Sequence, residues 1–504
     1  MKKFAILCVI CSLLLCACSA GGQSHNSSED PNQAGASAQN QPKREGHSFY
    51  HPSLPKVNFA GETVTIAVSA HKEQELFPSE QETGEIAQNK REVWEHIRKI
   101  YDCNVSILPV SQQDWGREVI PQLLSGKQYA YLLLPDVPQA AQLMAAGVCK
   151  DLNDPAYSAI INMKGDWWCP AAVKASTVGT ATYSGLLQLD RVYNNAWLLF
   201  YNKGMMNEVF DVQDSLPDLD RMYKKQWWTW EELSTLIKHA AKDLDQNSIF
   251  DETDRYGLAA ASDSVAAVAA AAGIDCAEPM QQAWTDPWNR SSSISSLKKL
   301  QTMYHADGVF HAQTQEQAIS MFTQGKSLFL AGRLDSLSSE AFADKNEEFG
   351  ILPIPTLQKQ QEYTYLLDGD ITFGMIPCTV STPTRSAVLL EELMYDFWYL
   401  HREPLQKLLV ARLGDDLSEQ IAMTALDYAT ISMTTMLKSF DGGAYEQLSK
   451  TPLRNLFENA QYNVEQGFSK IAQQVQNVLQ RYWEQVNQGT VINLNTRDGS
   501  AIDA

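Results

Sequence analysis

An acidic stretch in the middle of the chain carries oxygen-bearing groups at regular short intervals. They fall at positions 1, 3, 5, 7, 9 and 12 of an EF-hand-like loop: Asp243, Asp245, Asn247, Ile249, Asp251 and Asp254. Oxygen ligands at this spacing can wrap one Ca²⁺, with Ile249 contributing its main-chain carbonyl. Ser248 replaces the usual turn glycine, and Asp254 is shorter than the usual glutamate. The pattern therefore predicts either a structural Ca²⁺ site or a solvated acidic turn.

Tryptophans form a second group with chemical potential, and the chain has 12 of them. Sugars present apolar C–H faces that lie on aromatic rings, while their hydroxyls need charged or amide partners. Trp167 and Trp168 stand in a loop before Pro170, and Trp284 lies in another loop that contains proline. We expect these three tryptophans to contact a ligand, with packing in the core as the alternative.

Sequence patterns of catalysis are missing. The chain has no HExxH and no GxSxG, and Gly325-Lys326-Ser327 resembles only the end of a P-loop, since Ser320 stands where the first glycine is needed. Cys8 and Cys11 form a CxxC pair in the apolar N-terminal run, but no such pair is present beyond residue 18, so the common zinc and redox motifs are absent from the rest of the chain. The residues alone therefore assign no catalytic activity. Acidic pairs are plentiful, so a carbohydrate-active enzyme stays as an alternative.

The N-terminus has the three-part layout of a secretory signal. Lys2 and Lys3 precede the uncharged apolar run 4–15, which is too short to span a bilayer, and small residues come after it. Residues 15–18 (Leu-Cys-Ala-Cys) resemble a bacterial lipobox. This resemblance implies removal of residues 1–17 and lipid, such as palmitate, on the Cys18 sulfur. We expect a protein anchored by lipid to the cell membrane and facing the outside of the cytoplasm.

Composition constrains the chain beyond the predicted signal. Residues 18–56 contain mostly Gly, Ser, Asn, Gln and Pro, which cannot bury enough apolar surface to fold, so they read as a flexible tether. The remaining body is large enough for two lobes. The formal net charge of −20 argues against binding of nucleic acid, because that depends on neutralising phosphates.

Hydrophobic periodicity indicates an α/β body. Val64, Ile66 and Val68 alternate as in a strand, and an amphipathic helix over 84–101, a strand at 105–107, a helix over 115–124, a strand over 129–134 and a helix over 139–146 come next. Further strands are predicted at 196–201, 327–331 and 371–376, and helices start at Thr229 and over 385–401. Residues 417–487 read as entirely helical. We therefore expect two α/β lobes with a helical C-terminal region.

Five segments in order resemble family 1 extracellular solute-binding proteins, the group that contains the maltose-binding proteins. They are Leu198–Lys203, Thr229–Leu233, Tyr256–Leu258, Gly325–Gly332 and Phe349–Pro353. The resemblance implies a two-lobed, type II periplasmic-binding-protein-like fold with a ligand cleft and a hinge. It also implies a monomer that is not an enzyme. Such a protein captures a small solute, most simply a sugar, and delivers it to ABC transporter permease subunits. A receptor that passes its ligand to a sensor kinase is a further alternative.

The resemblance also places the lobes and the polar ligand candidates. Lobe 1 is predicted as 57–185 with about 371–440, lobe 2 as about 186–370 with 441–493, and 494–504 as a tail. Asp136 comes after a buried strand, where open α/β sheets bind ligands. The other predicted contacts lie near the crossings or after Gly332: Asp190, Asn194, Asn195, Arg333, Asp335, Asp368 and Asp370. A hinge hydrogen bond or a turn is the alternative role for each of them.

Overall fold

The computed structural model describes residues 51, 54–187, 196–210, 216–343, 348–369 and 371–495. The predicted signal peptide, Cys18 and most of the predicted tether lie outside these ranges. His51 and Leu54, at the end of the predicted tether, are buried with 6% and 7% exposure. Packing against the folded body therefore begins earlier than the predicted boundary at residue 57.

Lobe 1 is built on a parallel sheet of order β2-β1-β3, with β1 at Thr63–Ser69, β2 at Asn104–Val110 and β3 at Leu132–Leu134. The register pairs Ile66 with Ile107 on one side and with Leu132 on the other. β3 is apolar at every position because both faces of the strand are buried. The predicted alternation of strands and helices is confirmed here.

Helices cover both faces of this sheet. α2 (Glu85–Tyr101) and the first half of α14 (Pro383–Leu413) pack in one core cluster, while α3 (Ile120–Leu124) and α4 (Val137–Ala145) pack in another. The other elements of this lobe are η1 (Ala70–Lys72), α1 (Glu73–Leu76), the π-helix η2 (Trp115–Val119), α5 (Pro155–Ser158), α6 (Pro170–Ala175), β4 (Thr177–Val178) and β5 (Ala181–Thr182).

Lobe 2 is built on a five-stranded mixed sheet of order β11-β7-β10-β8-β9. Its strands are β7 (Trp197–Asn202), β8 (Tyr256–Ala261), β9 (Val309–Ala312), β10 (Ser327–Arg333) and β11 (Phe349–Leu352). β8, β9 and β10 run parallel, whereas β7 is antiparallel to both β10 and β11. The helices of this lobe are α7 (Lys203–Phe210), α8 (Leu219–Lys224), α9 (Trp230–Ala240), α10 (Ser264–Ala271), α11 (Ser291–Tyr304), α12 (Gln315–Thr323), η5 (Leu334–Ser338), α13 (Glu340–Ala343) and α17 (Ala444–Glu458).

The predicted start of α9 is confirmed in detail. The hydroxyl of Thr229 accepts a hydrogen bond from the main-chain N–H of Glu232 at 3.5 Å. Such a cap satisfies one of the free N–H groups of the first turn. Leu233, Leu236 and Ile237 on the buried face then hold the helix against the lobe 2 core.

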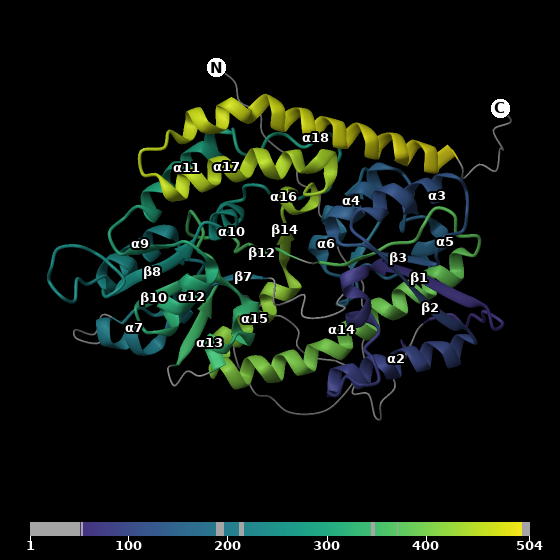
Figure 1. Ribbon diagram of the computed structural model, residues 1–504, viewed down its shortest axis with the longest axis horizontal. Helices are drawn as coiled ribbons and strands as arrows, with labels where there is room; N and C mark the ends of the chain where they lie inside the picture. The colour runs from purple at the N-terminus through teal and green to yellow at the C-terminus, as the bar shows by residue number, and fades with distance from the viewer. Residues whose placement is uncertain are drawn as a thin grey trace, which may run out of the picture. The chain divides into compact units, whose positions relative to one another are not determined.

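Several segments connect the lobes. β6 (Gly185–Leu186) pairs with β13 (Phe373–Gly374), and β12 (Tyr365–Leu367) runs parallel to β14 (Ala429–Ile431). The last helix, α18 (Val464–Asn495), lies along α17 and α11 of lobe 2 and reaches α4 of lobe 1 (Figure 1). Its Gly489 approaches Gly147 backbone to backbone, so closely that a Cβ on either residue would clash. Small residues at this crossing let α18 contact both lobes.

The C-terminal region differs from the prediction in two ways. Residues 417–487 are not entirely helical, because β14 separates α15 (Asp416–Asp427) from α16 (Met433–Met436) and η6 (Phe440–Gly443). α14 continues past the predicted end at residue 401 and through Pro404, since Leu405, Leu409 and Leu413 give it a further buried stripe. Its second half and α15 contact β11 of lobe 2, although we assigned residues up to about 440 to lobe 1.

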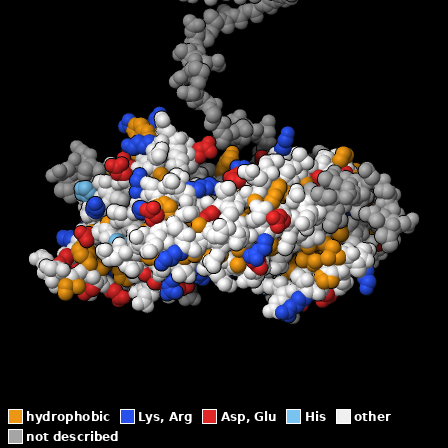
Figure 2. All heavy atoms as spheres, turned by 90° about the horizontal axis from the view of Figure 1, so that it is seen from above, with side chains coloured by type: hydrophobic (Ala, Val, Ile, Leu, Met, Phe, Trp, Pro, Cys, Tyr) orange, Lys and Arg blue, Asp and Glu red, His pale blue; other side chains and the backbone are white. Residues whose placement is uncertain are grey.

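The predicted strand at 371–376 is shorter than expected. Only Phe373 and Gly374 form β13, while Thr372 and Met375 make single bridges to residues of lobe 1. None of the helices in the described part of the chain is long and apolar enough to cross a membrane. Acidic and basic side chains are interspersed on the face shown in Figure 2, rather than separated by sign.

Candidate functional site

The carboxyl ends of the lobe 1 strands bring three polar residues together. Ser69 ends β1, His71 lies two residues later, and Asp136 stands between β3 and α4. The Ser69 hydroxyl accepts the main-chain N–H of Asp136 at 3.2 Å, and His71 Nε2 lies 3.6 Å from Asp136 Oδ2. We call these three residues the strand-end edge.

Exposure separates the roles that these residues can take. The Asp136 side chain is 4% exposed, whereas the His71 side chain is 38% exposed. The carboxylate therefore lies behind the imidazole and can orient it, while the imidazole can meet a solute. The bridge of Asp136 to Thr372 ties the edge to the segment that crosses between the lobes. Asp136 was predicted from the sequence as one of the ligand contacts. His71 was not among them, although its place just beyond the end of β1 could have indicated this position.

The remaining polar candidates have local partners. Asp368 comes directly after β12 and accepts the main-chain N–H of Gly369 at 2.8 Å. Arg333 at the end of β10 pairs with Asp335, with 2.7 Å between Nη2 and Oδ2. Partial burial raises the pKa of Asp335 although the Arg333 charge opposes this effect. Asp190, Asn194, Asn195 and Asp370 lie outside the described residues.

Trp168 lies in the interior of lobe 1, and Trp167 is half-buried beside it. Their indole N–H groups both donate to the carboxylate of Glu391 on α14, at 2.8 and 2.9 Å. Trp168 is only 2% exposed, and burial raises the pKa of Glu391, whose side chain is fully enclosed. This arrangement corresponds to the alternative in which both tryptophans support the core, because neither indole N–H is left to bind a ligand.

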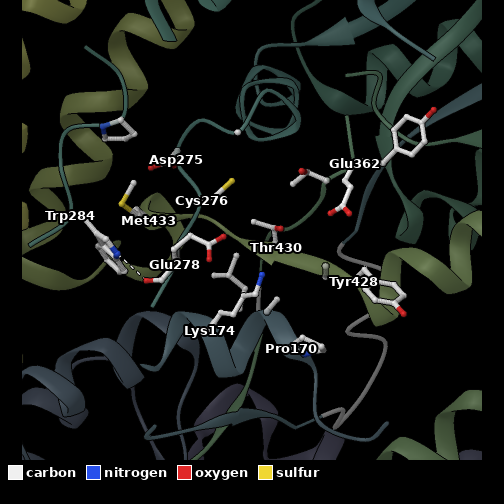
Figure 3. Close-up of a pocket in the computed structure, with 18 of the residues that line it drawn as sticks. Pro170, Lys174, Asp275, Cys276, Glu278, Trp284, Glu362, Tyr428, Thr430 and Met433 are labelled. Atoms are coloured by element: carbon white, nitrogen blue, oxygen red, sulfur yellow. Dashed lines mark hydrogen bonds between the residues drawn. The ribbon is translucent and has the colours of Figure 1, made fainter. Parts of the chain in front are cut away.

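A cavity of about 460 Å³ lies where α6 of lobe 1 faces β14 and the loops of lobe 2 (Figure 3). Its walls come from four parts of the chain: α6, the loop after α10, the segment before β12, and β14 with its flanks. We call it the α6–β14 cavity. Trp284 is the one predicted ligand contact among the residues that line it.

The loop that carries Trp284 is firmly held. Its indole N–H donates to the main-chain oxygen of Glu278 at 3.0 Å, and its ring stacks on Tyr482 of α18 with 5.8 Å between the centroids. Gln476, also on α18, donates to the Trp284 carbonyl at 3.2 Å. This wall of the cavity is therefore positioned in advance.

Asp275 forms the buried back of the cavity. Its carboxylate accepts hydrogen bonds of 2.6 Å from the hydroxyls of both Thr434 and Tyr445. Burial raises the pKa of Asp275 to about 7, although these hydrogen bonds oppose the shift. The residue thus joins the loop after α10 to α16 and α17.

The cavity and the strand-end edge share no residues. The cavity is lined by residues 362–364 before β12, while Asp368 and Thr372 come after that strand. The loop at 273–278 lines the cavity after α10, whereas the carboxyl end of β8 leads into the start of that helix. Eight helical residues span about 12 Å, so the loop at 273–278 lies well away from the carboxyl end of β8.

The acidic loop has the shape of a turn with an oxygen cluster. Ligand atoms of Asp243, Asp245 and Asp254 lie within 4.8 Å of one another. Ser248, in place of the usual glycine, adopts φ +66° and donates its N–H to Asp243 at 2.8 Å. Asp251 instead accepts from Thr253 and stands outside this cluster.

Comparisons with known proteins agree on one family and fold. A family model described as bacterial extracellular solute-binding protein matches residues 102–394, more than half of the chain. No curated protein sequence matches the chain. A crystal structure of a cyclo/maltodextrin-binding protein complexed with maltotetraose is similar, with a TM-score of 0.55 and 14% identity over 82% of this chain and 96% of that one.

Two further structures show the same likeness. UspC of M. tuberculosis has a TM-score of 0.54 and 15% identity over 83% of this chain and 100% of its own. A sugar transporter protein from Rhizobium etli, in an open conformation, has a TM-score of 0.54 and 13% identity over 84% and 99%. These likenesses show the two-lobed type II fold, as predicted.

Proposed function

Because this chain belongs to the bacterial extracellular solute-binding protein family, we propose that it captures a small carbohydrate and delivers it to the permease of an ABC importer. The pairing of His71 with Asp136 supports the carboxyl ends of the lobe 1 strands as the place where the solute binds. Ligands of open α/β sheets bind at such ends. No covalent step is needed for this role.

The groups at these ends suit a ligand rich in hydroxyls. Imidazole, carboxylate and guanidinium together can donate to and accept from sugar hydroxyls. His71 supplies the exposed contact of lobe 1, and Asp136 positions it. Asp368 at the crossing and Arg333 with Asp335 in lobe 2 are the contacts we propose from the other side. A similar structure was solved with maltotetraose, which supports a carbohydrate as the ligand class.

A screen by thermal unfolding tests the proposal on the full chain in detergent, with mono- and oligosaccharides. A ligand that binds only the folded state stabilises it by about 2.7 kcal/mol at a concentration of 100 Kd. We expect one sugar class to raise the unfolding midpoint without being hydrolysed. Turnover of a chromogenic glycoside would instead support an enzyme, and no shift with any sugar would remove the carbohydrate assignment.

Lipid anchoring is the second part of the proposal. The lipobox-like residues 15–18 support acylation of Cys18, and two acyl chains hold a protein stably on a bilayer where one does not. Labelling of cells with a palmitate analogue should mark the wild-type protein in the membrane fraction. The Cys18→Ala variant should lose the label and leave the membrane, and a label that persists in this variant would contradict the proposal.

We also propose that the acidic loop binds Ca²⁺. Asp243, Asp245 and Asp254 supply clustered carboxylates, and Asn247 and Ile249 add further oxygens from the same turn. Both Asp254 oxygens already accept main-chain N–H groups but keep a second lone pair each. Ca²⁺, and not Mg²⁺ at equal ionic strength, should raise the unfolding midpoint of the wild type and leave Asp243→Asn unchanged. An equal shift in both proteins would favour the solvated turn.

A further inference from the structure

The α6–β14 cavity is large enough for a ligand of its own. Small-molecule sites typically enclose about 300–1,000 Å³, and this cavity of about 460 Å³ falls within that range. It runs along β14 and takes in the loop after α10, and none of the residues that line it belongs to the strand-end edge. An occupant of the cavity would therefore not compete for His71 or Asp136.

Charged groups of both signs stand around the cavity on separate walls. Lys174 projects from α6, Glu278 comes from the loop after α10, and Glu362 precedes β12 (Figure 3). Within the part of the chain that the structure describes, no ion pair engages any of these three side chains. Arg290, the other cation, donates to the Thr285 hydroxyl at 2.6 Å.

Apolar surface lies between these charges. Trp284 is fixed by Glu278 and Tyr482, and Tyr363 stacks on Tyr223 with 5.3 Å between the ring centroids. Tyr428 is 67% exposed beside the cavity, an unusual exposure for so large an apolar side chain. Aromatic faces next to carboxylates are favourable surroundings for an ammonium group. Walls that are fixed before binding also reduce the ordering cost of association.

We propose that the α6–β14 cavity binds a small zwitterion, with its ammonium group at Glu278 and Glu362 and its anionic group at Lys174. All three side chains are exposed to solvent; a zwitterion can pair with both signs of charge, whereas a neutral sugar offers them only hydrogen bonds. The anionic group can be a carboxylate, as in an amino acid or a dipeptide, or a phosphate, as in phosphocholine. This inference does not depend on the proposed carbohydrate site.

Isothermal titration of the full chain in detergent tests the inference with three probes. Glycyl-leucine and phosphocholine are the zwitterions, and N-acetyl-glycyl-leucine amide is a capped probe of similar shape without charges. We expect one of the zwitterions to bind and the capped probe not to bind. Which zwitterion binds distinguishes the carboxylate source from the phosphate source.

Variants locate the bound probe. Lys174→Met and Glu362→Gln remove one charge each from positions that are not buried, where substitutions seldom disturb folding. Each should weaken the zwitterion about tenfold or more, since a hydrogen bond to a charged group is worth about 1.5–3 kcal/mol. His71→Gln, at the strand-end edge, should leave this affinity unchanged.

Three results would overturn the inference. They are no heat with either zwitterion, equal binding of the capped probe, and an affinity that Lys174→Met and Glu362→Gln both leave unchanged. The carbohydrate screen is independent of these results, because its ligand lacks charge. A sugar that binds while no zwitterion does would keep the proposed function and reject this cavity as a ligand site.

Discussion

The tryptophan pair of lobe 1 and Trp284 stand in similar sequence surroundings but take different places in the structure. Both loops contain proline and both were predicted to contact a ligand. The pair donates to a buried carboxylate, Glu391, that lies more than 200 residues away in the chain. Trp284 donates to a nearby main-chain oxygen and keeps part of its ring at a cavity. The distant partner, and not the local sequence, decides whether a tryptophan supports the core or a surface.

The comparison is tested most strongly at Glu391. In Glu391→Ala two indole N–H groups lose their acceptor, and an unsatisfied buried donor costs about 1–3 kcal/mol. We expect the free energy of unfolding in urea to fall by about 2–5 kcal/mol. Glu391→Gln keeps one acceptor oxygen and should lose less. Equal stability of Glu391→Ala and the wild type would show that the pair does not depend on this carboxylate.

Asp275 behind Trp284 should make stability depend on pH. Its pKa is about 7 in the folded state against an ordinary 3.8, so the folded state binds the extra proton between these values. Stability from this residue is fully present below pH 3.8 and is lost as pH rises to 7, by up to about 1.4 kcal/mol per pH unit. Urea titrations at several pH values should show a flatter profile for Asp275→Asn. If the free energy of unfolding depended on pH equally in Asp275→Asn and the wild type, the raised pKa of Asp275 would be contradicted.

Trp284 itself should matter less for stability than the pair. Its ring is partly exposed and stacks on one partner, Tyr482, and such aromatic pairs contribute about 0.5–1.5 kcal/mol beyond burial. We expect Trp284→Ala to reduce the free energy of unfolding by about 1–2 kcal/mol. Trp168→Ala is the matched comparison and should cost about 3–5 kcal/mol. The reverse order would break the contrast between the two regions.

The N-cap of α9, remote from both tryptophan sites, shows how much stability a single local hydrogen bond contributes. Thr229→Ala removes the acceptor of the Glu232 N–H and should cost about 1 kcal/mol in unfolding free energy. Thr229→Ser keeps the hydroxyl and should be close to the wild type. If both variants lost the same stability, packing of the threonine methyl group would be the cause.

Sequence reasoning succeeded where one local rule determines the outcome. The cap at Thr229 and the apolar run of β3 depend on neighbours within a few residues. Asp136 was placed at a strand end because the end of β3 fixes its position. Its contact with His71 was missed, since it joins two strands through their register in the sheet.

The features that the sequence did not predict depend on contacts between segments that are distant in the chain. β14 has only three residues, too few for a period to be visible, and it exists because β12 pairs with it. The α6–β14 cavity has walls from four separate parts of the chain, so none of its charged residues stood out in the sequence. Helix α14 continues past its predicted end at residue 401, because the buried stripe beyond Pro404 packs against distant parts of the chain.

Capture of the solute at the strand-end edge is tested directly by titrating the full chain with the carbohydrate that raises its unfolding midpoint most. We expect His71→Ala to bind this sugar about 10–100-fold more weakly than the wild type, because the variant loses one hydrogen bond to a charged or strongly polar group. Glu362→Gln, at the α6–β14 cavity, should bind it as the wild type does. Full affinity in His71→Ala, or a loss confined to Glu362→Gln, would contradict capture of the solute at the strand-end edge.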